Sequence, residues 1–189
     1  MKSPIIVALD MESERALELA KKLNPQECKV KVGSQLFTAD GPIIIDKLNE
    51  LGFDIFLDLK FHDIPNTVKK AVEVAIKMGV WMLNVHSLGG KEMLRAAYEV
   101  VEKVSIKPLL VGVTVLTSLN DKSLKEVGLG LNTEDQVLLL AELCQAEGLN
   151  GVVCSASELS ILRKHLDKDF LLVTPGIRSS GLEKDDQKR

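Results

Sequence analysis

The chain has 189 residues, of which 46% are hydrophobic, and it carries a formal net charge of −3 with a sequence pI near 5.7. This size suits one globular domain with a core of its own, so we expect a single domain over residues 1–189. No basic cluster before the last few residues is long enough to follow a phosphate backbone, which argues against nucleic acid as a partner.

The N-terminal segment carries an apolar run of only five residues before Asp10. Such a run is too short for the core of a signal peptide and for a membrane span. The three cysteines, Cys28, Cys144 and Cys154, are odd in number and lack C-x-x-C spacing, so we expect reduced, buried thiols with structural roles. These features predict a cytoplasmic protein with no membrane partner.

Short apolar and β-branched runs recur along the chain and predict seven β-strands. They lie at residues 5–9, 30–32, 55–59, 81–85, 109–116, 151–154 and 170–175. The 3.6-residue period of a helix appears between them, for example around residues 16–23 and 68–75. Strict alternation of strand and helix predicts parallel strands joined by crossover helices.

Seven βα units favour a (β/α)₈ TIM barrel whose eighth unit is missing from this chain. The last eleven residues, SSGLEKDDQKR, are polar and contain glycine, which predicts a loop after the seventh strand. An open barrel would leave unpaired edges on its first and last strands. We therefore expect the natural chain to continue past Arg189 through another helix and an eighth strand.

Charged residues occur where the first three strands end. Side-chain alternation places Asp58 and Lys60 on the inward face of the third strand, and Asp63 follows in the loop. Lys31 and Asp10 end the second and first strands, at the edge where barrel enzymes hold their catalytic groups. One surface ion pair alone would favour a structural role. Several charges in one barrel mouth are costly to bury, which favours a functional site.

The run from Asp58 to Thr67, DLKFHDIPNT, resembles the D-x-K-x-x-D-I-P-x-T signature of the orotidine 5′-phosphate decarboxylase family. The segments Ala-Leu-Asp at 8–10 and Lys-Val-Gly at 31–33 precede it, as they do in that family. The similarity runs in the same order from residue 4 to residue 189, through the segments at 84–86, 115–118, 151–156 and 173–178.

The resemblance implies removal of CO₂ from orotidine 5′-phosphate to give uridine 5′-phosphate, the last step of pyrimidine nucleotide synthesis, without metal or organic cofactor. Lys60 would stabilise the negative charge at C6 of the pyrimidine and then protonate that carbon, while Asp58 would lie against the substrate carboxylate. Asp10 and Lys31 would hold ribose hydroxyls, and Lys31 would also link Asp58 to Asp63 of a partner subunit. Fixed charges stabilise a carbanion more strongly in a dry pocket than in water.

A homodimer with shared active sites is also implied, in which Asp63 and Thr67 reach the neighbouring site. Thr117 would bond the pyrimidine edge, although a hydroxyl that caps backbone is the simpler interpretation of that residue alone. The loop after the seventh strand would close over the substrate and hold its phosphate through Pro175, Gly176, Arg178 and Gln187. A further phosphate contact of the family, a Gly-Arg pair after the eighth strand, has no counterpart in these 189 residues.

The histidines do not form a recognisable metal-binding pattern. His62, His86 and His165 are too scattered along the sequence, so we expect no metal site. We interpret His165 as a surface helix residue and His86 as a strand-end residue that lines the barrel mouth.

Three other functions remain open from the sequence. Related sugar-phosphate decarboxylases or synthases use a similar Asp-x-Lys-x-x-Asp motif with Mg²⁺, and a chelator would separate them from this protein, although Lys31 and the Ile64–Thr67 continuation argue against them. A Schiff-base aldolase with Lys60 as nucleophile would be trapped by borohydride. A nucleotide-binding remnant would bind uridine 5′-phosphate without turning over orotidine 5′-phosphate.

Overall fold

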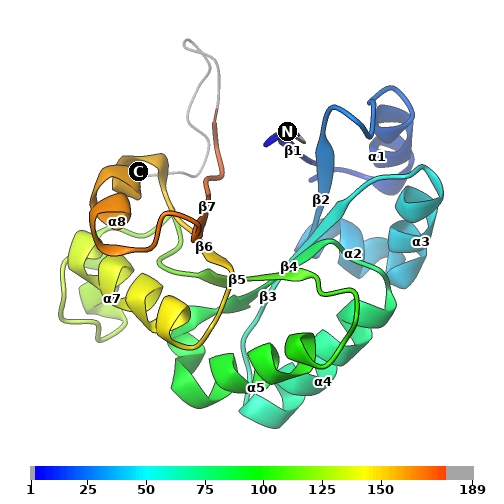
Figure 1. Cartoon of the computed structure of the whole chain (residues 1–189). Coiled ribbons are helices and arrows are strands. Elements are labelled where there is room, and N and C mark those ends of the chain that lie inside the picture. Colours follow the sequence, from blue (N-terminus) through cyan, green and yellow to red (C-terminus); the bar gives the residue numbers. More distant parts are fainter. Residues whose placement is uncertain (1–2, 178–189) are drawn as a thin grey trace.

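The sheet of this protein follows the order of its strands along the chain. The computed structural model describes residues 3–177, and within them seven parallel strands form one sheet in the order β1-β2-β3-β4-β5-β6-β7. The sheet curls, and the helices lie on its outer side (Figure 1). All seven predicted strands are confirmed, and with the helices that alternate with them they form the curled half of a TIM-barrel-like fold. The strands are β1 Ile6–Ala8, β2 Lys29–Gly33, β3 Ile55–Phe61, β4 Met82–His86, β5 Leu109–Val113, β6 Gly151–Val153 and β7 Leu171–Val173.

The crossover segments are helical, but two of them contain more than one α-helix. Between β2 and β3 the chain breaks at Gly41, whose φ of 62° is in the left-handed region, and Pro42 then begins a new helix. None of the helices within residues 3–177 has the length and apolar character needed to cross a membrane. The helices are α1 Ser13–Ala20, α2 Ser34–Asp40, α3 Pro42–Glu50, α4 Pro65–Lys77, α5 Gly90–Glu102, α6 Asp121–Glu126, α7 Thr133–Ala146 and α8 Leu159–His165, with 3₁₀ turns η1 Ser87–Gly89 and η2 Ala156–Glu158.

Alternation along the strands divides the apolar residues into two buried layers. Val30, Val32 and Leu57 belong to the large core between the sheet and its helices. Phe56 and Met82 belong to a smaller cluster on the inner face of the sheet, which Val111 completes. The facing predicted for β2 and β3 is therefore correct for these residues.

The sheet has two edge strands, β1 and β7, each paired on one side only. They lie apart from each other in Figure 1, so the barrel is open between them. The part of the predicted loop after the seventh strand that holds Arg178 and Gln187 lies outside the described residues. The expected eighth strand remains a prediction.

A tight junction joins the middle of β5 to the helix that covers it. The Cys144 thiol of α7 lies 3.0 Å from the Ser87 hydroxyl, and burial raises the pKa of this thiol to about 11. A Cβ atom added at Gly112 would clash with Cys144 Sγ and would lie 2.7 Å from Ser87 Oγ. Only glycine therefore allows this approach of helix and strand.

We predict that Gly112→Ala lowers the free energy of unfolding by about 1–3 kcal/mol, because the added methyl overpacks this junction. Urea denaturation would measure the change. Gly130→Ala is the matched control, since an added Cβ there meets no atom within 4 Å. Equal stability of the two variants would contradict the account of this junction.

Candidate active site

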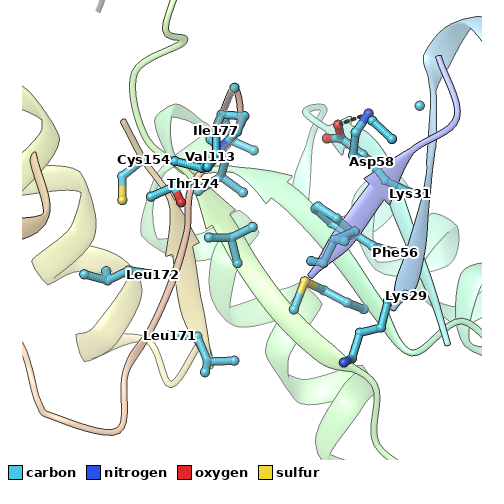
Figure 2. A pocket seen from close by; sticks show the side chains of 18 of the residues that line it. Lys29, Lys31, Phe56, Asp58, Val113, Cys154, Leu171, Leu172, Thr174 and Ile177 are labelled. Carbon is cyan, nitrogen blue, oxygen red and sulfur yellow. Dashed lines mark ion pairs between the residues drawn. The ribbon is translucent and has the colours of Figure 1, made fainter. Parts of the chain in front are cut away.

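Four charged side chains meet at the carboxyl ends of the first three strands. Lys31 Nζ lies 2.9 Å from Asp10 Oδ1 and 3.2 Å from Asp58 Oδ2. Lys60 Nζ lies 2.7 Å from the other oxygen of Asp58. Figure 2 shows the ion pair of Lys31 with Asp58 at one end of the cavity. The structure thus brings together four residues that the sequence analysis selected.

Asp58 is the buried centre of this network. Its side chain is 12% exposed, against 52% for Asp10 at the outer end. A buried carboxylate loses the hydration that stabilises its charge in water, and it needs paired cations and hydrogen bonds to replace it. Lys31 and Lys60 supply the cations, one at each oxygen, so Asp58 holds both ammonium groups within reach of the cavity.

The strand carrying these groups is irregular, a feature that the sequence analysis missed. Lys60 has a φ of 52°, and the pairing of β3 with β4 shifts register between Leu57 and Phe61. Asn84 of β4 accepts a hydrogen bond from Lys60 N–H at 2.7 Å and donates one to Asp58 Oδ1 at 2.6 Å. The signal in the sequence was a single asparagine, Asn84, inside the apolar run at 81–85, because a polar side chain buried in a strand needs hydrogen-bond partners.

The four charges border an open cavity of about 1300 Å³ that is lined by the inner faces of the strands. Thr117 and Pro175, both predicted to bind substrate, also line it. At the opposite end Lys29 donates to the Ser3 carbonyl oxygen at 2.7 Å and lies 4.8 Å from the centre of the Trp81 ring. Figure 2 shows Lys29 well separated from Asp58. The cavity therefore has a charged mouth that carries both signs and an apolar interior.

Gly33, the last residue of β2, leaves space for the ion pair of Asp10 and Lys31. A Cβ atom at Gly33 would lie 2.7 Å from Asp10 Oδ1 and 3.2 Å from Lys31 Nζ. A side chain at position 33 would require the ends of these two flexible side chains to shift. Glycine at position 33 thus leaves the space that the pair occupies.

Two predicted site residues do not reach the cavity of their own chain. Asp63 and Thr67 are exposed and are not among the residues that line it. Asp63 Oδ1 accepts a hydrogen bond from the adjacent Ile64 N–H at 2.7 Å. Within residues 3–177, no ion pair joins Asp63 to Lys31 or Lys60.

Two of the histidines meet beside the network, which their sequence spacing did not reveal. The rings of His62 and His86 stack with centroids 5.1 Å apart, so His86 packs on a histidine instead of lining the cavity. Burial, and then the neighbouring His62 and Lys60, lower the pKa of His86 from 6.5 to about 4. The surface placement of His165 is confirmed by its 46% exposed side chain.

Among the described residues, the charged groups of the mouth do not form a metal site. Within this part of the chain, no three His, Cys, Asp or Glu side chains are grouped so that they could hold a metal ion. The charged mouth instead combines carboxylates with ammonium groups, which suits a substrate that carries charge of its own.

Comparison with known proteins identifies the family. The sequence pattern of the Orotidine 5'-phosphate decarboxylase / HUMPS family matches residues 3–189. The chain belongs to this family.

Its relatives share both sequence and architecture. A Marinomonas protein named orotidine 5′-phosphate decarboxylase is 54% identical, over 99% of this chain and 80% of its own length. A Dichelobacter nodosus protein of the same name is 54% identical, over 99% of this chain and 82% of its own. The crystal structure of orotidine 5′-phosphate decarboxylase from Lactobacillus acidophilus superposes with a TM-score of 0.86 at 41% identity, covering 93% of this chain and 82% of that one.

In this member of the Orotidine 5'-phosphate decarboxylase / HUMPS family, His86 gives the fold a pH dependence. The folded-state pKa of about 4 lies below 6.5, the ordinary value for a histidine. Between these pH values the unfolded chain therefore binds more protons at His86 than the folded protein does. The contribution of neutral His86 to stability is thus complete above pH 6.5 and is lost as pH falls toward 4. We predict that the free energy of unfolding of His86→Asn falls less over this window, as urea titrations at several pH values would show.

Asparagine suits this test because its side chain can also accept the hydrogen bond that Leu88 N–H donates to His86 Nδ1. His165→Asn serves as the control for loss of one histidine. The same pH dependence in His86→Asn and the unaltered protein would contradict the predicted role.

Proposed function

We propose that this protein catalyses the decarboxylation of orotidine 5′-phosphate to uridine 5′-phosphate and CO₂, in pyrimidine nucleotide synthesis. The main support is the juxtaposition of Lys60 with the buried Asp58, at 2.7 Å, in the mouth of a barrel cavity. The names and the 50–54% identity of the relatives add to it. We also place the reaction in the cytoplasm, in keeping with three cysteines that are all buried as thiols outside any disulfide.

The chemistry proposed for the site is electrostatic. The substrate carboxylate lies beside Asp58, and the bond from C6 to the carboxylate breaks so that CO₂ leaves and the electron pair stays on C6. The Lys60 ammonium stabilises this negative charge and then transfers a proton to C6, after which solvent reprotonates the amine. Because the ion pair with Asp58 already fixes Lys60, little reorganisation is needed as charge develops.

Nucleotide binding is assigned to the residues around this centre. Asp10 and Lys31, already paired at 2.9 Å, hold the ribose hydroxyls, and Thr117 bonds the pyrimidine edge. The phosphate is assigned to the segment after β7 that includes Pro175, Gly176, Arg178 and Gln187. Pro175 and Gly176 line the cavity, which supports this assignment.

A homodimer with two shared sites is the assembly we propose. Asp63 and Thr67 lie just beyond β3, are exposed, and make no contribution to the cavity of their own chain. Ile64 between them is a large apolar residue left 67% exposed, which contact with a second chain would cover. In a two-fold dimer, each site then combines Asp58 and Lys60 of one chain with Asp63 of the other.

We predict that Lys60→Ala loses at least about 10³-fold in kcat, because the ammonium acts mainly on charge present in the transition state. The change in absorbance on conversion of orotidine 5′-phosphate would measure the rate. Isothermal calorimetry should show that the variant still binds uridine 5′-phosphate.

Lys91→Ala is the matched control for loss of a lysine. Lys91 lies on α5, where its ammonium pairs with Glu147 at 3.4 Å, away from the cavity. Near-normal turnover by Lys60→Ala would refute the assignment, whereas Lys91→Ala should retain full activity.

We predict that two inactive variants, Lys60→Ala and Asp63→Ala, recover activity when their subunits exchange. Each mixed dimer then holds one site with both defects and one site with neither. An equal mixture should reach about a quarter of the activity of the unaltered protein, since half of the dimers are mixed and one site in each is intact. The absorbance assay measures this recovery.

Native mass spectrometry of isotope-labelled subunits would establish that exchange has taken place. Mixing each variant with itself is the control and should give no recovery. If mixed dimers form and no activity appears, Asp63 acts within its own chain and the shared-site proposal is wrong.

A further inference from the structure

Among the described residues, Asn84 is the one that forms hydrogen bonds both with the backbone of Lys60 and with the side chain of Asp58. It lies in the middle of β4 and is fully buried. Its Oδ1 accepts from Lys60 N–H at 2.7 Å, and its Nδ2 donates to Asp58 Oδ1 at 2.6 Å. Both polar ends of one rigid amide are therefore satisfied by the two residues at the centre of the proposed site.

The strand pairing explains why a side chain is needed here. Leu57 pairs with Leu83 and Phe61 with Val85, so one residue of β4, Asn84, faces three residues of β3. Regular pairing is impossible across such a mismatch, and the bulged backbone loses ladder partners. On its other side, Asn84 pairs in regular register with Val111 of β5. The Asn84 side chain thus connects β4, which pairs regularly with β5, to the bulged strand β3.

The bulge places Lys60 in a backbone conformation that a lysine rarely adopts. Its φ of 52° makes it the only non-glycine residue with positive φ within residues 3–177. Such a conformation costs free energy and persists only when surrounding bonds determine it. The hydrogen bond to Asn84 is such a bond, because it begins at the Lys60 backbone nitrogen itself.

We propose that Asn84 is a positioning residue that holds Lys60 and Asp58 in one fixed geometry. The inference rests on the proposed function, since it assigns to Asn84 the alignment of the ammonium that protonates C6. An amide is required because the site needs an acceptor for an N–H group and a donor for a carboxylate on one planar group. Leucine, of similar shape, supplies neither.

Aspartate at position 84 provides the sharpest test. It keeps the acceptor for Lys60 N–H but loses the donor, and when ionised it repels Asp58 at hydrogen-bond distance. When the carboxyl groups of Asp58 and of the new aspartate share one proton, a hydrogen bond between them can form again. The titratable groups near position 84 are Asp58, the two lysines bound to it, Lys31 and Lys60, and His86 two residues along β4, which interacts with Lys60. Its β5 partner Val111 carries no charge.

For Asn84→Asp we expect kcat for orotidine 5′-phosphate to fall on the order of 10²-fold at pH 8, as small misplacements of reacting groups do. The ratio of its kcat to that of the unaltered protein should rise as pH is lowered and the shared proton binds. The dissociation constant for uridine 5′-phosphate should change far less than kcat, because the product lacks the reacting carboxylate.

Asn150→Asp is the matched control. Asn150 Oδ1 also accepts a hydrogen bond from the backbone of a neighbouring strand, Leu110 N–H at 2.8 Å, but Asn150 does not line the cavity. Its aspartate variant keeps that acceptor and should retain the kcat and pH profile of the unaltered protein.

A normal kcat in Asn84→Asp, or a loss of equal size at every pH, would overturn the proposal. A crystal structure of Asn84→Ala decides the same question without turnover: φ of Lys60 leaving the positive region supports the proposal, and unmoved Lys60 and Asp58 overturn it. If both variants fail to fold, Asn84 is architectural and the proposal is wrong. If the unaltered protein does not turn over orotidine 5′-phosphate, the proposed function fails, while the Asn84→Ala structure still decides the role of Asn84.

Discussion

The buried carboxylate of Asp58 is the constraint on which this site depends. A charge that is 12% exposed is stable only with close partners, and three of them surround it: Lys31 at 3.2 Å, Lys60 at 2.7 Å and the Asn84 amide at 2.6 Å. Lys31 comes from β2, Lys60 from β3 and Asn84 from the middle of β4, so the carboxylate joins three neighbouring strands. The fold brings these strands side by side, and the buried charge determines how their ends are arranged.

The same constraint gives the site its chemical character. In water, an ammonium beside a carboxylate is largely screened, whereas in the mouth of an apolar cavity the interaction of fixed charges is stronger. Lys31 extends the network to Asp10, so the charges alternate in sign from the solvent-exposed end inward. A reacting group that gains negative charge next to Lys60 would meet a cation already in place, which is the electrostatic arrangement that stabilises a developing anion.

Much of this arrangement could be predicted from the sequence, because it follows from periodicity. The alternation of Val30 with Lys31 and of Leu57 with Asp58 was enough to place apolar residues under the helices and charges toward the barrel axis. The bulge at Lys60 could not be predicted from the asparagine at position 84 alone, since it depends on a register mismatch with a strand 24 residues away along the chain. The stacking of His62 on His86 was missed for the same reason: contacts between strands are set by tertiary packing.

In the proposed function, the network around Asp58 decarboxylates orotidine 5′-phosphate through the charges of its own side chains, without a metal ion. The most direct measurement is the rate of absorbance change when the unaltered protein, dialysed against EDTA, is given orotidine 5′-phosphate. We expect turnover at the same rate before and after chelation, with uridine 5′-phosphate as the product. No turnover by the folded protein, or turnover that returns only when Mg²⁺ is added, would contradict it.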